Sequence, residues 1–227
     1  MKVKLISYSQ PQQPNNSASE PVLKSLQDLV AYCARVSNPS NQMNTETNEK
    51  LIRYLMKNEH WSPLEMVSIC LEIETTRDIA RQILRHRSFS FQEFSQRYAV
   101  ADLGFESREA RLQDKKNRQN SIELDDSENE ETQELVVEWE KKQKEIQEMA
   151  EHTYSWALQK GIAKEQARSV LPEGMTVSRM YMNGTLRSWV HYIKLRSGNG
   201  TQKEHRQVAL ACAEIISSIY PLIQELI

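Results

Sequence analysis

Residues 66–76 read MVSICLEIETT and residues 77–87 read RDIARQILRHR, and the hydrophobic period changes where these two segments meet. Apolar and polar residues alternate in the first segment, which predicts a strand with one apolar face and one polar or functional face. In the second segment apolar residues recur every three or four positions, which predicts a helix. The apolar positions are Val67, Ile69, Leu71 and Ile73 in the strand and Ile79, Ala80, Ile83 and Leu84 in the helix, and the polar strand face carries Ser68, Glu72 and Glu74.

Apolar patterns and polar breaks also occur on both sides of this unit. Residues 2–8 predict a short strand, and the proline-rich residues 11–21 predict a loop. Residues 106–131 contain almost no large apolar side chains and predict a long polar loop. Helices are predicted over residues 23–36, 45–58, 135–160 and 202–226. We expect an α+β fold in which a central, mostly antiparallel sheet is flanked by helices.

The composition limits the class of protein. The chain has 227 residues, of which 39% are hydrophobic, so it can bury one substantial core, and we expect a single domain over residues 1–227. The formal net charge of -2 gives no overall attraction to nucleic acids or anionic membranes, so any anion-binding site must be local. No segment approaches the roughly 20 apolar residues of a membrane span, and the N-terminus lacks the apolar stretch of a signal peptide. We expect a soluble, cytoplasmic protein with small-molecule substrates and no nucleic-acid or membrane partner.

The three cysteines, Cys33, Cys70 and Cys212, are odd in number and widely spaced. This arrangement fits neither a disulfide framework nor the CxxC pairs of a zinc site. We interpret them as reduced thiols in the core and expect no bound metal. None is predicted to act as a nucleophile, because Cys70 has no cation near it and the other two have apolar neighbours.

Residues 77–97 carry a local excess of positive charge, since five arginines stand against two acids. Guanidinium groups bind phosphate with two parallel hydrogen bonds, so this segment is a candidate anion-binding site. On the predicted helix, Gln82, Arg85 and His86 are three and four positions apart and would share one face. The charged residues are Arg77, Arg81, Arg85, Arg87, Arg97, Asp78 and Glu93.

The same segment is compatible with several different roles. The arginines also fit a solvated helix face on which they pair with acids. The aromatic residues fit either an ordinary core or a set of stacking surfaces between polar groups; they are Phe89, Phe91, Phe94 and Tyr98. Basic residues between aromatic ones are also typical of modules that bind single-stranded nucleic acid. A helical scaffold that binds partner proteins through the charged segment 135–160 is a further alternative.

Residues 85–97, RHRSFSFQEFSQR, contain a spaced pattern of polar residues. The triplet RHR is followed by seven residues and then by Ser95, with Glu93 two positions before this serine and Arg97 two positions after it. This pattern resembles the signature of the flavin-dependent thymidylate synthases, and its many fixed polar positions make it specific. Gln92 stands where the family usually has asparagine, which keeps the amide group.

Further segments resemble the same family, so the resemblance covers most of the chain. They read ARVS at 34–37, HWSPLE at 60–65, ARSVLP at 167–172, TLRSWVHY at 185–192 and KLRSGNGTQKEH at 194–205. Met66 replaces a frequent histidine of the family, and Thr185 replaces an asparagine that binds flavin in some relatives. Taken singly, Arg168 and Arg187 also fit ordinary surface arginines, and His191 fits a histidine in the core.

The resemblance implies three sets of site residues. The nucleotide would be bound by Gln82, Arg85, Glu93, Phe94, Ser95, Gln96, Arg97, Arg168 and Arg196. The flavin would be bound by Ser37, His60, Ser62, Glu65, Arg85, His86, Arg87, Glu93, Arg187 and His191. Catalysis would involve His86, Arg97 and Arg196. We expect Ser95 to be a ligand of the nucleotide and not a nucleophile, because no histidine lies near it in the sequence to act as a base.

The reaction that the resemblance implies is the reductive methylation of dUMP to dTMP. It would use FAD as the bound cofactor, methylenetetrahydrofolate as the carbon donor and NADPH as the electron source, and would release tetrahydrofolate. Side chains cannot supply a hydride, which is why a flavin is needed. The resemblance also implies a homotetramer whose active sites are shared between subunits. The run KKNRQNS at 115–121 fits a contact with folate or NADPH and, somewhat better, a solvated loop.

Overall fold

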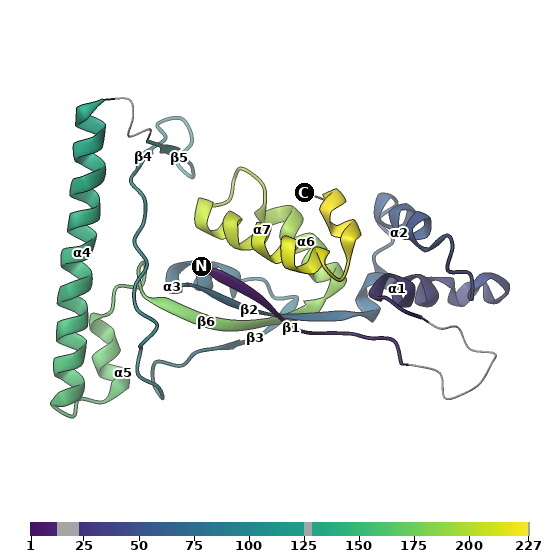
Figure 1. Ribbon diagram of the computed structural model, residues 1–227, viewed down its shortest axis with the longest axis horizontal. Helices are drawn as coiled ribbons and strands as arrows, with labels where there is room; N and C mark the ends of the chain where they lie inside the picture. Colours follow the sequence, from purple (N-terminus) through teal and green to yellow (C-terminus); the bar gives the residue numbers. More distant parts are fainter. Residues whose placement is uncertain (13–22, 125–128, 227) are drawn as a thin grey trace.

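β2 (Ser68–Thr76) and β6 (Val177–Thr185) are the two central strands of a four-stranded sheet. The strand order is β1-β2-β6-β3, where β1 spans Lys2–Tyr8 and β3 spans Phe89–Glu93, and every neighbouring pair is antiparallel. The computed structural model describes residues 1–12, 23–124 and 129–226 (Figure 1). The predicted strands at 2–8 and 66–76 and the predicted fold class are confirmed, whereas the loop predicted at 11–21 lies mostly outside the described residues.

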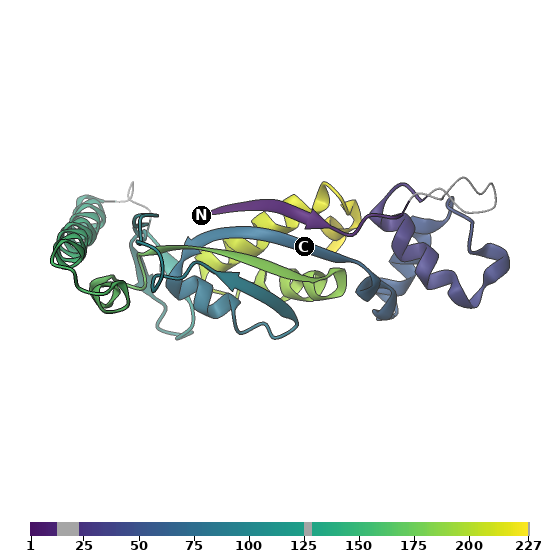
Figure 2. The ribbon, with the colours of Figure 1, turned by 90° about the horizontal axis from the view of Figure 1, so that it is seen from below.

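One face of the sheet forms the main core. Ile69, Leu71 and Ile73 of β2 are fully buried there, as their alternation with polar residues predicted. The helices α3 (Arg77–Ile83), α6 (Leu186–Arg196) and α7 (Lys203–Ser217) pack on this side, and both views show α6 and α7 lying across the sheet (Figures 1 and 2). The opposite face carries polar or partly exposed side chains such as Glu72 and Tyr181.

The other helices lie beyond the two ends of the sheet. α1 (Leu26–Ala34) and α2 (Asn48–Lys57) form one end of the long axis, and α4 (Glu130–Gln159) and α5 (Lys164–Ala167) form the other (Figure 1). Within the described ranges, no helix is both long enough and apolar enough to cross a membrane. Short 3-10 turns complete the chain at η1 (Arg35–Ser37), η2 (Pro39–Asn41), η3 (Ser62–Met66), η4 (Arg168–Val170) and η5 (Pro221–Leu226).

The predicted helices at 23–36, 45–58 and 135–160 are present as α1, α2 and α4, with shifted ends. A capping box fixes the start of α1, because Ser25 Oγ accepts a hydrogen bond from Asp28 N–H at 3.1 Å. The helix predicted over 202–226 is too long. α7 ends at Ser217, and Pro221 opens a separate 3-10 turn because proline cannot continue an α-helix.

α3 is also shorter than predicted, since it ends at Ile83. Arg85 and His86 therefore lie in the turn after the helix, and the prediction that they share a helical face with Gln82 is wrong. The tertiary structure explains the early end, because the chain must turn back at this point to place β3 beside β6.

The segment 106–131, predicted as a long polar loop, contains a two-stranded hairpin of β4 (Arg111–Gln113) and β5 (Ser121–Glu123). Ion pairs attach this hairpin to the start of α7. Lys203 Nζ lies 2.8 Å from the carboxylate of Glu109 and 2.7 Å from that of Glu123. Residues 125–128 lie outside the described part of the chain, and α4 begins at Glu130.

The three cysteines are free thiols, as predicted, but only Cys212 is fully buried in the core. Cys33 and Cys70 are partly exposed, so the prediction that all three are core residues is wrong for these two. Burial nevertheless raises the pKa of both of these thiols, which disfavours the reactive thiolate.

Candidate active site

Arg85, His86 and Arg87 lie in the turn that connects α3 to β3. Backbone hydrogen bonds close this turn, from His86 N to Ile83 O at 3.0 Å and from Phe89 N to His86 O at 3.3 Å. Arg85 and Arg87 are exposed, and neither forms an ion pair with another described residue. Their guanidinium groups are therefore accessible to an anionic ligand.

Arg77 and Arg81 of α3, in contrast, are paired with acids. Arg81 donates hydrogen bonds to Glu93 at 2.8 Å and to Glu173 at 3.1 Å. Arg77 Nη1 lies 3.7 Å from Glu93 Oε1, and Ser178 Oγ donates a hydrogen bond to the same oxygen at 3.0 Å. The alternative of acid-paired arginines is therefore correct for α3 and does not apply to the turn that follows it.

His86 points toward α6. Arg196 Nε donates a hydrogen bond to His86 Nε2 at 2.9 Å, and the ring of His86 meets that of Tyr192 edge to face, with centroids 4.9 Å apart. A ring nitrogen that accepts a hydrogen bond carries no proton, so His86 is neutral with its hydrogen on Nδ1. Burial and the neighbouring charge of Arg196 lower the pKa of His86 to about 4. This contact joins two predicted site segments that are 110 residues apart in the sequence.

A second histidine, His205 of α7, is fully buried near His86. Its Nε2 lies 3.1 Å from the hydroxyl of Tyr192, and its Nδ1 lies 3.3 Å from Gln82 Oε1. Gln82 Nε2 donates a hydrogen bond to Gln202 Oε1 at 2.8 Å. The predicted nucleotide ligand Gln82 is therefore held between a buried histidine and an exposed glutamine.

Sequence reasoning missed His205, although its position is a usable signal. It lies three residues before Val208 and seven before Cys212, so it belongs to the apolar stripe of α7. A histidine on such a stripe must find hydrogen-bond partners inside the core.

Residues 94–97 continue from β3 and carry four of the predicted nucleotide ligands. Phe94 N–H donates a hydrogen bond to Arg179 O at 2.8 Å, and Ser95 O accepts one from Tyr98 N–H at 3.1 Å, which forms a turn. Gln96 is only 3% exposed, and its Nε2 has no hydrogen-bond partner among the residues that the structure describes. A buried amide without a partner costs about 1–3 kcal/mol, so this group favours a ligand or a second copy of the chain at this position.

Arg97 and Arg168 both donate hydrogen bonds to Glu165. Arg97 Nε donates a hydrogen bond to Glu165 Oε2 at 3.2 Å, and Arg168 Nε donates one to the backbone oxygen of Glu165 at 3.3 Å. Lys164 Nζ also donates a hydrogen bond to Tyr98 O at 3.1 Å, which ties α5 to the segment after β3. The structure thus brings together two of the predicted nucleotide ligands.

Half of the residues predicted to bind flavin lie around η3 and in α6. Arg187 forms an ion pair with Glu65, and the ring of Trp61 packs against that of His191 with centroids 4.6 Å apart. His191 is exposed, so it is not a core histidine. Partial desolvation of the ring, followed by the charge of Arg187, nevertheless lowers the pKa of His191. Three further predicted flavin ligands are exposed, namely Ser37, His60 and Ser62.

Two parts of the predicted site lie at opposite ends of the long axis of the folded chain. Ser37 ends the 3-10 turn that follows α1, and Arg168 begins the turn that follows α5. Both views place α1 and α5 at opposite ends of the long axis (Figures 1 and 2). One copy of the chain therefore does not bring all the predicted flavin and nucleotide residues together in one compact site.

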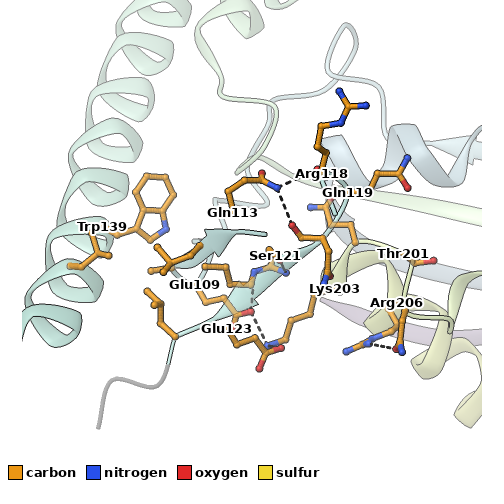
Figure 3. A pocket seen from close by; sticks show the side chains of 18 residues that line it. Glu109, Gln113, Arg118, Gln119, Ser121, Glu123, Trp139, Thr201, Lys203 and Arg206 are labelled. Carbon is orange, nitrogen blue, oxygen red and sulfur yellow. Dashed lines mark hydrogen bonds and ion pairs between the residues drawn. The ribbon is translucent and has the colours of Figure 1, made fainter. Parts of the chain in front are cut away.

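A pocket of about 790 Å³ lies between the β4–β5 hairpin, α4 and the turn that leads into α7 (Figure 3). Its walls include Arg118 from the hairpin loop, Trp139 from α4 and Arg206 from α7. Gln202 also lines this pocket, so the pocket borders the polar network around Gln82. The run at 115–121 therefore contributes in part to a pocket wall.

The chain matches the family described as "Thymidylate synthase complementing protein" over residues 22–222. It is 45% identical over 223 residues to the probable flavin-dependent thymidylate synthase of Paramecium bursaria Chlorella virus 1, which covers 98% of this chain and 97% of that protein. It is 48% identical over 224 residues to the flavin-dependent thymidylate synthase of Synechocystis sp., with the same two coverages. Among solved structures, it is similar to the UMP/dUMP methylase PolB from Streptomyces cacaoi bound with 5-Br dUMP. The TM-score is 0.78 at 26% identity, over 99% of this chain and 93% of that one.

Proposed function

The chain belongs to the family of flavin-dependent thymidylate synthases, and we propose that it converts dUMP to dTMP with methylenetetrahydrofolate as the carbon donor and NADPH as the electron source. The contact between His86 and Arg196 carries this proposal. It joins the RHR turn to the last family segment, and it leaves Arg85 and Arg87 exposed beside that junction. Tetrahydrofolate would be the released product of the carbon donor.

The residues of the RHR turn and of η3 fit a flavin chemically. FAD presents a flat aromatic ring with carbonyl acceptors and a pyrophosphate group. The accessible guanidinium groups of Arg85 and Arg87 suit the anionic and acceptor groups, and the ring pair of Trp61 and His191 offers aromatic surface. When bound, the flavin would supply the hydride that reduces the transferred carbon to a methyl group. Glu65, Arg187, Ser37, His60, Ser62 and Glu93 would complete its contacts.

The segment after β3 would bind the nucleotide together with α5. Arg97 and Arg168 would neutralise the phosphate, and Ser95 would donate a hydrogen bond to it. The unpaired amide of Gln96 supports a ligand or partner subunit at this position. Ser95 would not be a nucleophile, because no histidine forms a hydrogen bond with it among the described residues. Gln82, Phe94 and Glu93 would complete the nucleotide contacts.

His86, Arg97 and Arg196 would assist the reaction through position and charge. His86 holds no proton on Nε2, because that atom accepts a hydrogen bond from Arg196. The neutral imidazole therefore leaves Arg196 as the charged member of the pair, and this charge would stabilise negative charge that develops on the reacting ring.

We also propose a homotetramer with active sites shared between subunits. The opposite positions of the turns that contain Ser37 and Arg168 support this arrangement, since residues from different copies would have to meet for the flavin and nucleotide ligands to form one compact active site. Size-exclusion chromatography with light scattering should give a tetramer. A monomer that still binds flavin would contradict the shared site. A cytoplasmic location is the remaining prediction from the sequence.

We expect one of the two anionic co-substrates, folate or NADPH, to bind in the pocket between the hairpin and α7. Arg118 and Arg206 line it and Trp139 offers a ring for stacking, which suits an extended anion with an aromatic group (Figure 3).

The direct test is turnover by the purified protein supplied with FAD. Given dUMP, methylenetetrahydrofolate and NADPH, it should form dTMP and tetrahydrofolate, and omission of any one component should stop the reaction. A flavin absorbance near 450 nm should accompany the protein. If the protein instead remains colourless after reconstitution and binds single-stranded nucleic acid in a salt-sensitive manner, the nucleic-acid alternative is correct. If dUMP does not raise its melting temperature and no turnover occurs, a scaffold role is favoured.

A further inference from the structure

A row of hydrogen bonds connects α6 to the β4–β5 hairpin, from a buried pair at His205 to an exposed one at Gln202. Tyr192 contacts His205, His205 contacts Gln82, and Gln82 contacts Gln202 at the distances given above. Gln202 Nε2 then donates to Glu204 Oε2 at 2.9 Å. Arg111 of the hairpin donates a hydrogen bond to the other oxygen of Glu204.

The carboxylate at the end of this row fixes the direction of every hydrogen bond in it. Glu204 can only accept, so Gln202 must turn its amide N–H toward Glu204 and its oxygen toward Gln82. Gln82 must then present its own N–H to Gln202 and its oxygen to His205. An ion pair with Arg111 and a contact with Arg108 hold Glu204 in the charged form that sets this direction.

The same logic fixes the tautomer of His205. Because Gln82 Oε1 is an acceptor, His205 Nδ1 must carry the hydrogen, and Nε2 must accept the hydrogen of the Tyr192 hydroxyl. The opposite tautomer would place two acceptors against each other in a fully buried position, which costs free energy. Burial also raises the pKa of Tyr192 well above its usual value, so this hydroxyl keeps its hydrogen.

We propose that His205 is a positioning residue for the substrate site, which as the Nδ1–H tautomer holds the amide of Gln82 in one orientation. In this orientation the second N–H of Gln82 Nε2 remains available to donate a hydrogen bond to a ligand. Gln82 would therefore recognise an acceptor oxygen, either a carbonyl or a phosphate oxygen of the nucleotide. This inference rests on the proposed function, because it takes dUMP as the ligand.

The test uses the flavin-loaded, full-length protein and measures the Kd of dUMP by calorimetry and its KM by turnover. His205→Leu removes both hydrogen bonds and should raise the Kd and KM of dUMP about three- to tenfold, with a smaller change in kcat. His205→Asn places an amide N–H near the position of Nδ1 and should restore the Kd to within about twofold of the wild type. The matched control is His152→Leu at an exposed histidine of α4, which should leave the Kd unchanged.

A double-mutant cycle separates positioning from a general effect on folding. In a Gln82→Ala protein, His205→Leu should cause no further loss of dUMP affinity, because the group that it positions is gone. A further loss of the same size would overturn the inference. So would a folded His205→Leu protein with wild-type dUMP affinity.

If His205→Leu does not fold, Tyr192→Phe provides a second test. It removes one hydroxyl from the row and should raise the Kd of dUMP about two- to fivefold, and an unchanged Kd overturns the inference. Absence of dUMP turnover in the wild-type protein would instead contradict the proposed function. Failure of the inference and failure of the proposed function are therefore distinguishable.

Discussion

Arg97 donates a hydrogen bond to the carboxylate of Glu165 at 3.2 Å, across the junction between the segment after β3 and α5. The proposed phosphate ligand is therefore paired with an acid of its own chain. Both side chains are about half exposed, at 55% and 47%, so the pair is an exposed ion pair of small net free energy. A phosphate at this position would compete with Glu165 for the guanidinium group.

This competition predicts opposite effects for two substitutions. Arg97→Ala should weaken dUMP binding by about 1.5–3 kcal/mol, since it removes a hydrogen bond to a charged group. Glu165→Gln should strengthen dUMP binding by up to about 1 kcal/mol, because the guanidinium group no longer has to leave a carboxylate. Calorimetric titration with dUMP measures both effects.

Glu214→Gln is the matched control for charge, since Glu214 is an exposed acid on α7. It should leave the affinity for dUMP unchanged. Equal effects of the two Glu→Gln variants would show that only the net charge matters, and unchanged affinity in Arg97→Ala would remove Arg97 from the site.

A second prediction concerns the strand that holds the RHR turn in place. Gly184 of β6 pairs with Phe89 of β3, and a Cβ added at Gly184 would lie 2.4 Å from Phe89 Cδ1. Gly184→Ala should therefore destabilise the protein by about 1–3 kcal/mol and lower its Tm. Gly174→Ala is the control, because a Cβ there meets no atom within 4 Å. Equal Tm values for the two variants would mean that the ring of Phe89 moves aside at no cost.

A third prediction concerns the pocket between the hairpin and α7. Arg118→Ala should raise the KM of folate or of NADPH severalfold and leave the KM of dUMP unchanged, because Arg118 lines the pocket and Arg97 does not. Lys115→Ala removes an exposed charge from the same loop at a residue that does not line the pocket, so it should change none of the three values. If both variants behave like the wild type, the run at 115–121 is solvated.

A fourth prediction concerns the pH dependence of stability. Burial, followed by the charge of Arg196 and the ring of His86, lowers the pKa of His205 from 6.5 to about 3. His205 therefore stays neutral in the folded protein, whereas the unfolded chain binds a proton at this residue near pH 6.5. Its contribution to stability is fully present above that pH and is lost as the pH falls. Between pH 6.5 and 5 the loss should be about 1–2 kcal/mol.

Denaturant unfolding at these two pH values measures this effect. His86 has a lowered pKa and acts in the same direction, so the comparison must be made between variants. His205→Asn should lose less stability than the wild type between pH 6.5 and 5. His152→Asn, at an exposed position on α4, should lose as much as the wild type. The prediction fails if all three proteins lose the same amount.

The local pattern of residues determined much of the secondary structure. The strand at β2 and the buried stripe of α3 follow from the periods of apolar residues, because burial on one side of an element selects those positions. The spacing of RHR, Glu93, Ser95 and Arg97 indicates the family without any knowledge of the fold. The hairpin at 111–123 does not follow from the sequence pattern. Ion pairs with α7 hold it in place, and such pairs leave no periodic apolar signal in the sequence.

The tertiary structure alone decided which polar groups meet. The end of α3 at Ile83, the contact of Arg196 with His86 and the burial of His205 beside Gln82 each depend on segments that are far apart in the sequence. Hydrogen bonds act over about 3 Å and only along particular directions, so their partners follow from how the strands and helices pack. A sequence period records which side of an element is buried, but it does not record what that side will face.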